Sequence, residues 1–367
     1  MKKTLNVKPV FLKENNAALF LKLRSRVNEI VKNLEPRKKS TIILKAVLFP
    51  AFYILTYSMV LIWGNVPAVL YGGYIVLGLL IILNFLNLIH EAVHHTLFAD
   101  KRLNNWYVHF FDLLGANSFI WKIRHIRLHH NYPNVMGWDS DIEQSPIARI
   151  FPEGDYEPIH RYQHIYLPFL YPFFLLNWLL IRDFKDFFRS DSIVKKVVVI
   201  PKIEFVKLFL FKLLFLFYIL IVPMLVLNIS FFQVFSAFLV MMFSASFLAL
   251  IVLLSPHANI ESAFPQPDEN VHMPTSWFMH QLMCTNDIKE DNRFTRFFMG
   301  CFNYHIAHHL FPGINHVYYP EVTKAIEEFA RENKLPYRKF SLFTSLKNHY
   351  TLLKRNAFHE NIFEETM

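Results

Sequence analysis

The chain of 367 residues is 53% hydrophobic and 17% aromatic, and only 18% of its residues carry a charge. Soluble domains are about 45–50% apolar and about 25% charged, so this composition excludes a disordered chain and predicts a protein that buries apolar surface in lipid. The net charge of +9 is typical of basic residues that flank membrane spans, and no nucleic-acid partner is expected.

Segment 1–40 is strongly basic, with eleven Lys or Arg residues against three acidic ones. Within it, apolar residues that include Leu23 and Val27 recur at helical spacing, and Arg24 and Lys32 lie on the opposite side. This pattern predicts a basic amphipathic helix that lies at a membrane surface.

Two pairs of long apolar stretches follow this segment. The first pair covers about residues 42–63 and 66–89, and the second covers about residues 205–227 and 231–254. Each stretch reaches or exceeds the roughly 20 residues that a helix needs to cross a bilayer. Because each pair is joined by a short turn, the sequence predicts two transmembrane hairpins and therefore four spans.

The distribution of basic residues predicts how these hairpins are oriented. The turns around Gly64 and Asn228 carry no charge, whereas Lys and Arg concentrate in the other connections, so we expect both termini and the middle segment in the cytoplasm. Lys45 and Lys212, near the basic ends of two spans, are expected to extend their side chains to the headgroups. The predicted fold is all-α and integral to the membrane, with a cytoplasmic helical cap.

Residues Tyr166–Ile181 form a shorter apolar stretch that contains Pro168 and Pro172. Because this stretch is short for a span and has arginines at both flanks, we predict an interfacial helix. A fifth crossing would place the later histidines on the opposite side of the membrane from the earlier ones. We assign residues 41–345 to the membrane domain and residues 346–367 to a C-terminal tail.

Histidines gather in three clusters of one form: His90-Glu-Ala-Val-His94-His95, His125-Ile-Arg-Leu-His129-His130 and His305-Ile-Ala-His308-His309. Chance would produce about 0.1 such patterns in a chain with 18 histidines. Residues three or four apart lie on one face of a helix, so these imidazoles can converge on one ion, while the adjacent histidine points about 100° away and could reach a second. His257 follows the fourth span as His90 follows the second. The ten candidate metal ligands are His90, His94, His95, His125, His129, His130, His257, His305, His308 and His309.

The number of imidazoles indicates the kind of metal site. Zinc is usually satisfied by about three or four protein ligands, whereas ten imidazoles fit two ions that each keep an open position, as two O2-activating irons would.

A rival interpretation is that His90 to His94 reads H-E-x-x-H, the signature of zinc metallopeptidases, with Glu91 as the general base. In the di-iron interpretation Glu91 orients a neighbouring histidine instead, and Asp139 and Asp141 are further candidates for accepting imidazole N–H groups.

The three boxes around two hairpins resemble the integral-membrane fatty acid desaturase superfamily, and most closely its front-end, linoleoyl-CoA desaturase-like bacterial members. The likeness covers roughly residues 40–345. Three further stretches carry it: His129-His130-Asn131-Tyr132-Pro133-Asn134 followed by Asp139-Ser140-Asp141; Arg161-Tyr162-Gln163-His164; and Asn303-Tyr304-His305-Ile306-Ala307-His308-His309-Leu310-Phe311-Pro312. The last resembles N-Y-Q-I-E-H-H-L-F-P, in which front-end desaturases commonly have Gln where this chain has His305.

The resemblance implies a non-haem di-iron centre that uses O2 to introduce a cis double bond into a fatty acyl chain. This acyl chain would be covalently linked to a membrane lipid or carried as a thioester. It implies that nine of the histidines named above bind the irons, and it sets His95 apart, because the superfamily often uses only two histidines of the first box. Because the sequence has no H-P-G-G haem motif, the electron donor would be a separate protein, either a ferredoxin or cytochrome b5 with its reductase. The expected location is a bacterial inner membrane. The boxes do not separate desaturation from hydroxylation, so an acyl or lipid hydroxylase is the alternative.

Overall fold

The computed structural model describes residues 7–13, 16–143, 145–254 and 256–358. Residues 1–6 of the predicted basic segment and 359–367 of the predicted tail therefore lie outside the described residues. Within the described ranges the chain is mostly helical, in agreement with the predicted all-α class. The strands found there are β1 (Asp287–Ile288) and β2 (Lys339–Phe340), which pair in parallel.

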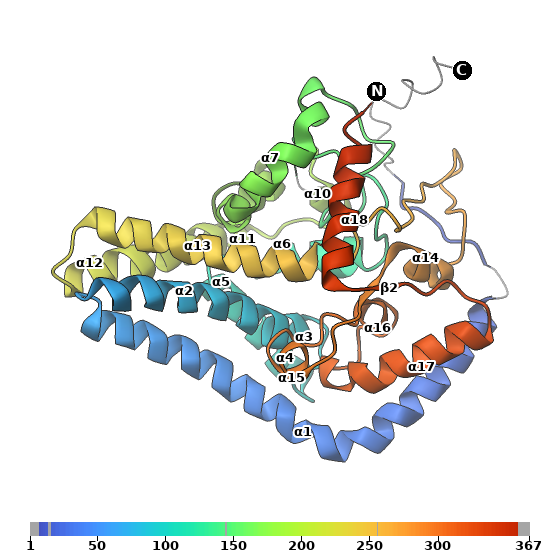
Figure 1. The fold of residues 1–367 in the computed structure, drawn as a ribbon, viewed down its shortest axis with the longest axis horizontal. Helices are drawn as coiled ribbons and strands as arrows, with labels where there is room; N and C mark the ends of the chain where they lie inside the picture. The colour runs from blue at the N-terminus through green and yellow to red at the C-terminus, as the bar shows by residue number, and fades with distance from the viewer. Residues whose placement is uncertain (1–6, 14–15, 144, 255, 359–367) are drawn as a thin grey trace.

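Two helices form the centre of the apolar bundle, α2 (Pro67–Asn84) and α13 (Phe231–Leu253), and they run side by side in Figure 1. A Cβ added to Gly78 of α2 would lie 2.2 Å from the carbonyl oxygen of Met241, so glycine allows the close approach of the two backbones. Ser230 caps α13 by accepting a hydrogen bond from the backbone N–H of Gln233, which satisfies one free donor at the helix start.

The remaining hairpin helices lie against this pair. The C-terminal half of α1 (Asn16–Trp63) packs along α2, and the partner of α13 consists of α11 (Lys202–Leu216), a π-helical turn (Phe217–Ile221) and α12 (Val222–Val226). The four apolar stretches of the sequence thus form the two predicted hairpins of helices.

Helix α1 differs from the sequence expectation because it continues from the basic segment into the first hairpin without a break, and Figure 1 shows it bending midway. The apolar face expected at a membrane surface is instead covered by α17 (Tyr319–Glu332): Leu23 and Val27 are buried in one cluster with residues of that helix. Arg26 also donates to Glu328 of α17 at 2.5 Å. The apolar stripe of α17 supplies the partner that the sequence alone did not reveal.

The two lysines expected at the headgroups are buried instead. Lys45 Nζ lies 2.9 Å from Asn87 Oδ1, and Lys212 Nζ lies 2.9 Å from Asp183 Oδ2. Both lysines are less than a tenth exposed. This expectation was wrong because polar partners inside the protein meet these side chains, so they need not extend to water.

Among the described residues, five helical stretches are long and apolar enough to cross a membrane: Asn16–Trp63, Pro67–Val93, Pro158–Phe188, Lys202–Val226 and Phe231–Leu253. Four of them correspond to the predicted spans, and Pro158–Phe188 contains the stretch predicted to be interfacial. This fifth stretch is irregular and consists of 3-10 helix (Pro158–Tyr162), α7 (Gln163–Leu170), 3-10 helix (Tyr171–Phe173), α8 (Phe174–Asn177), π-helix (Trp178–Arg182) and α9 (Asp183–Phe188). The prolines within it remove backbone donors and favour such breaks.

The segments at one end of the bundle, residues 90–157 and 256–358, are called the cap below. In Figure 1 the cap lies at the end of the bundle opposite α12. The described helices of the cap are α3 (His90–Val93), α4 (Lys101–Tyr107), α5 (Phe110–Leu113), α6 (Ser118–Lys122), a π-helical stretch (Ile123–His129), α14 (Trp277–Cys284), α15 (Arg293–Phe297), α16 (His305–Leu310), a 3-10 turn (His316–Tyr318), α17 and α18 (Leu342–Arg355). A short helix outside the cap, α10 (Ile193–Val197), precedes α11.

Candidate metal centre

The three histidine boxes come from different elements that meet where the bundle joins the cap. The first box begins α3, which continues α2 through a π-helical turn at Phe85–Ile89. The second box lies in the π-helical stretch Ile123–His129, and the third lies on α16. His257 is in the loop that follows α13.

Nine of the ten predicted ligands have ring nitrogens within 4.8 Å of those of their neighbours. The first histidine group consists of His90, His94, His125 and His308. The second histidine group consists of His129, His257, His305 and His309. His130 forms a third set with His308 and His309, so it lies between the two groups. Helix α16 contributes to both groups, because His308 faces the first and His305 and His309 face the second.

The nitrogen atoms in each group are closely spaced. In the first group, His125 Nε2 lies 3.1 Å from Nε2 of His90 and 3.1 Å from Nε2 of His94. In the second, His257 Nε2 lies 2.8 Å from His305 Nε2 and 2.9 Å from His309 Nε2. Two nitrogens that bind one ion at right angles, each about 2.1 Å away, would be separated by about 3 Å. The spacing therefore fits a shared ion in each group.

His130 reaches the groups because the second box is π-helical. In an α-helix, residue i+5 would point about 140° away from residue i, since each residue turns about 100°. Here the His130 N–H donates to the carbonyl of His125, five residues earlier, and this wider turn returns His130 to the same side. Its Nε2 lies 3.1 Å from Nε2 of His125. His130 was predicted as a ligand on α-helical geometry, which this wider turn replaces.

His95 is the one candidate that the structure does not bring to either group. Helix α3 ends at Val93, and His95 adopts φ +60°, the left-handed conformation that commonly follows a helix end. The chain therefore turns away after His94, and the His95 ring is only half-buried.

The buried histidines suit metal binding in their protonation as well as their spacing. Burial, followed by the charge of the other imidazoles, lowers the pKa of His125, His257 and His308 well below the ordinary value. These rings are therefore neutral at pH 7, which is the form that binds a metal. Among the described residues, His308 Nε2 is also a buried nitrogen with no hydrogen-bond partner. A buried polar atom of this kind is rare in proteins and fits a missing ligand bond.

Two carboxylates predicted to contact the ligands do so. Asp139 Oδ1 lies 2.9 Å from His129 Nδ1, and Asp141 Oδ2 lies 3.5 Å from His125 Nδ1. Burial lowers the pKa of His129, but the Asp139 carboxylate outweighs it, so the net shift is upward. Asp141 is in turn bound by Arg182 at 3.1 Å. Carboxylates in this position fix the orientation of a ligating imidazole and raise its basicity.

Sequence reasoning missed Gln281, which accepts a hydrogen bond from His309 Nδ1 at 3.0 Å and donates to the His130 carbonyl at 3.1 Å. One side chain thus connects ligands of two boxes. Gln281 lies in α14, in a stretch of ordinary apolar composition, and no spacing or motif singles it out.

Glu91 does not line the cavity described below. Its Oε2 accepts from the Thr96 hydroxyl at 2.7 Å and from the His316 backbone N–H at 3.1 Å, and its Oε1 lies 3.6 Å from His90 Nδ1. This placement beside the Nδ1 atom of a candidate ligand corresponds to an orienting role. A metallopeptidase base would have to reach a water on the open side of the metal.

A cavity of about 320 Å³ opens beside both histidine groups. This volume is at the lower end of the range of about 300–1,000 Å³ for ligand pockets. Five imidazoles belong to its wall: His90, His125, His129, His257 and His305. The rest of the wall is mainly apolar and comes from α7, α8, α13 and the loop 142–150. The site can therefore present a long apolar group to metal ions bound by the two groups.

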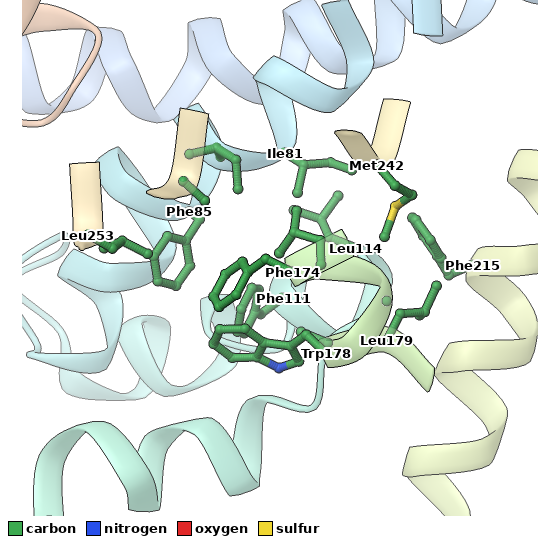
Figure 2. A pocket seen from close by; sticks show the side chains of 15 residues that line it. Ile81, Phe85, Phe111, Leu114, Phe174, Trp178, Leu179, Phe215, Met242 and Leu253 are labelled. Carbon is green, nitrogen blue, oxygen red and sulfur yellow. The ribbon is translucent and has the colours of Figure 1, made fainter. Parts of the chain in front are cut away.

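A second, mainly apolar pocket of about 50 Å³ shares part of its lining with this cavity, and Figure 2 shows its lining side chains. Phe85, Phe174, Trp178 and Leu253 line both spaces. The pocket continues between α2, α11 and α13, with Ile81, Phe215 and Met242 around it. The two spaces together extend from the histidines into the apolar bundle.

Comparison with known proteins agrees with this arrangement. A model of the fatty acid desaturase family matches residues 64–341. The chain is 28% identical over 340 residues to the sn-1 linoleoyl-lipid 6-desaturase of Arthrospira platensis, covering 92% of each chain. It is 27% identical to the acyl-lipid (8-3)-desaturase of Physcomitrium patens, covering 94% of this chain and 73% of the relative. It is 26% identical to the sn-1 linoleoyl-lipid 6-desaturase of Synechocystis sp., covering 84% of this chain and 86% of the relative.

Proposed function

We propose that this chain, which belongs to the fatty acid desaturase family, introduces a cis double bond into a fatty acyl chain at a di-iron centre with O2 as co-substrate. The observation that carries the proposal is the apolar cavity with imidazoles of both histidine groups in its wall. Such a cavity would hold an unreactive hydrocarbon beside two metal ions and exclude water from both.

The proposed ligands are the nine clustered histidines, with the first group and His130 at one iron and the second group at the other. When bound, the irons would supply the oxidising power that O2 and two electrons provide. The overall reaction converts –CH2–CH2–, O2, two electrons and two protons into –CH=CH– and two waters. The electrons would come from a separate ferredoxin or from cytochrome b5 with its reductase.

The cavity walls would perform the positioning. Apolar side chains from α7, α8 and α13 would hold the acyl chain against the histidines, so that one C–C bond faces the irons. The methyl end would extend into the small apolar pocket of Figure 2, which contains no charged side chain. We favour an acyl chain linked to a membrane lipid over a thioester, because the relatives reported above are named for lipid-linked substrates.

Product analysis tests the proposed function. The protein and a cavity-lining variant, His305→Ala, are expressed in a host that has no such desaturase, is supplied with linoleic acid in addition to its own acyl chains, and contains a ferredoxin or cytochrome b5 donor. By mass spectrometry we expect new double bonds in cells that express the unsubstituted protein and none in cells that express His305→Ala. The new double bonds should appear first in intact lipids rather than in thioesters. Hydroxylated acyl chains would favour the hydroxylase alternative, and no new product with either donor would contradict the proposal.

We propose further that Pro158–Phe188 does not cross the membrane, so that the protein has four spans. Near its start, Gln163 donates to the Leu353 carbonyl of α18 at 2.8 Å, and near its end, Arg182 donates to Asp141 at 3.1 Å. Leu353 and Asp141 both belong to the cap. Because both ends of the stretch contact the same end of the bundle, its two ends lie on one side of the membrane, which we infer is the cytoplasmic side.

Reporter tags test this topology. Tags inserted at Asn65, at Tyr156 and after the last residue are expected to report the outside, the inside and the inside of a bacterial inner membrane, because the hairpins enter and return. Accessibility to a membrane-impermeant reagent in intact and opened cells provides the measurement. Opposite locations for Tyr156 and the C-terminus would show a fifth crossing and would contradict the four-span arrangement.

A further inference from the structure

A chain of buried polar side chains leads from helix α1 to the first histidine box. Glu91 is 2% exposed, and beyond the contacts described above its Oε1 lies 3.3 Å from His316 Nδ1. His316 comes from the 3-10 turn before α17, and it is also 2% exposed. On its other side, His316 Nε2 lies 2.9 Å from Nζ of Lys45, which is 1% exposed. The order in space is thus Lys45, His316, Glu91, His90.

The chemistry of these groups assigns the protons along the chain. An ammonium group has three donors and no acceptor, and the donors of Lys45 meet Asn87 Oδ1 at 2.9 Å, the Arg296 carbonyl at 3.1 Å and His316 Nε2. His316 Nε2 must therefore accept, which places the ring proton on Nδ1, facing the Glu91 carboxylate. Burial, followed by the Lys45 charge, lowers the pKa of His316 to about 4, so the ring stays neutral.

We infer that Lys45 and His316 are positioning residues that act through Glu91 on His90. Lys45 fixes the His316 ring through Nε2, and His316 approaches the carboxylate with its Nδ1 at 3.3 Å and its backbone N–H at 3.1 Å. These contacts keep the carboxylate beside His90 Nδ1, which favours the proton on that nitrogen and leaves His90 Nε2 free to face the first histidine group. This inference rests on the proposed di-iron function. It assigns to α1, which contributes no histidine to either group, a role in orienting a metal ligand.

A role limited to packing does not account for this arrangement. A lysine in the apolar half of α1 is costly to bury, and an apolar residue would pack there without the cost. Lys45 and Glu91 carry opposite charges but do not touch, because the neutral imidazole of His316 lies between them. Removing either end would leave the other charge buried and only partly compensated, so the three side chains are expected to act as one unit.

The test compares iron binding in the purified full chain. Lys45→Met and His316→Leu are each expected to weaken iron retention against a chelator by about 10–100-fold, as loss of an orienting partner does. They should also alter one of the two iron signals in the 57Fe Mössbauer spectrum. His316→Gln, whose amide can accept from Lys45 and donate to Glu91, is expected to restore most of the retention and the natural spectrum. A purely structural residue would not show this pattern.

A double substitution keeps the inference testable even if a single charge removal lowers the yield of folded protein. Lys45→Met combined with Glu91→Gln removes both buried charges. If Lys45 acts through Glu91, the pair loses no more iron affinity than Glu91→Gln alone, because the path is already broken. Losses that multiply would show that Lys45 acts independently, and would overturn the inference.

Lys38→Met is the matched control. Lys38 is also on α1 and donates to the Val317 carbonyl at 2.7 Å and to Glu321 at 2.6 Å, but it has no contact with Glu91. This variant should keep the natural iron retention and spectrum. If the unsubstituted protein binds two irons and His316→Leu shows the same iron retention and the same Mössbauer signals, this inference alone is overturned. If the unsubstituted protein binds no iron, the proposed function is overturned, and the inference with it.

Discussion

His308→Ala is expected to eliminate detectable desaturation and to lower bound iron from about two per chain to one or none. His308 belongs to the first histidine group and also to the set that contains His130 and His309, so its loss affects two sets of candidate ligands. Its Nε2 is buried with no hydrogen-bond partner among the described residues, as expected for an atom that binds a metal. Product formation in cells and iron per purified chain are the two measurements.

Two other histidines provide matched controls for this loss. The His272 side chain is 51% exposed and lies outside the histidine groups, so His272→Ala should keep both iron and activity. His95→Gly removes an imidazole from the first box itself, at a position whose left-handed backbone favours glycine, and it should keep both as well. A His308→Ala protein with two irons would contradict the proposed site, and loss of iron in His95→Gly would place His95 among the ligands.

The apolar hairpins could be predicted from the sequence because their signal is local. A run of apolar residues long enough to cross a bilayer needs no distant partner to be recognised, and the predicted stretch 231–254 differs from α13 (Phe231–Leu253) by one residue. The histidine boxes were visible for the same reason. Helical spacing predicted seven of the nine clustered histidines, since short helices convert sequence spacing into direction, and His257 was predicted from its place after the fourth span.

The remaining features depend on backbone details and contacts that no local pattern specifies. The π-helical second box turns His130 inward, and the left-handed residue after α3 turns His95 outward, although both follow an identical H-x-x-x-H. Gln281 meets His309 only because α14 packs on α16. Lys45 was expected to reach the headgroups because its partners Asn87 and His316 are far away in sequence.

Asp139→Asn is expected to reduce iron affinity and turnover by about 10–100-fold while the protein still folds. Asp139 is fully buried, and its Oδ1 accepts from His129 Nδ1 at 2.9 Å and from the backbone N–H of Asp141 at 3.1 Å. Its Oδ2 accepts from the Asn134 N–H at 2.8 Å. Both oxygens therefore act only as acceptors, and a carboxylate satisfies all of these donors at once.

An asparagine side chain cannot do so, because its amide nitrogen would face a donor. Either His129 loses its acceptor or the Asn134 N–H is left buried without one, and an unsatisfied buried donor costs about 1–3 kcal/mol. Iron per chain, turnover and the free energy of unfolding measure the two effects. Asp268→Asn is the control, because Asp268 also lies near a histidine, 3.8 Å from His272 Nδ1, but is 55% exposed and lies outside the histidine groups. Natural iron affinity in Asp139→Asn would show that the carboxylate only supports the loop, whereas iron loss much greater than the stability loss indicates that its charge maintains the basicity of His129.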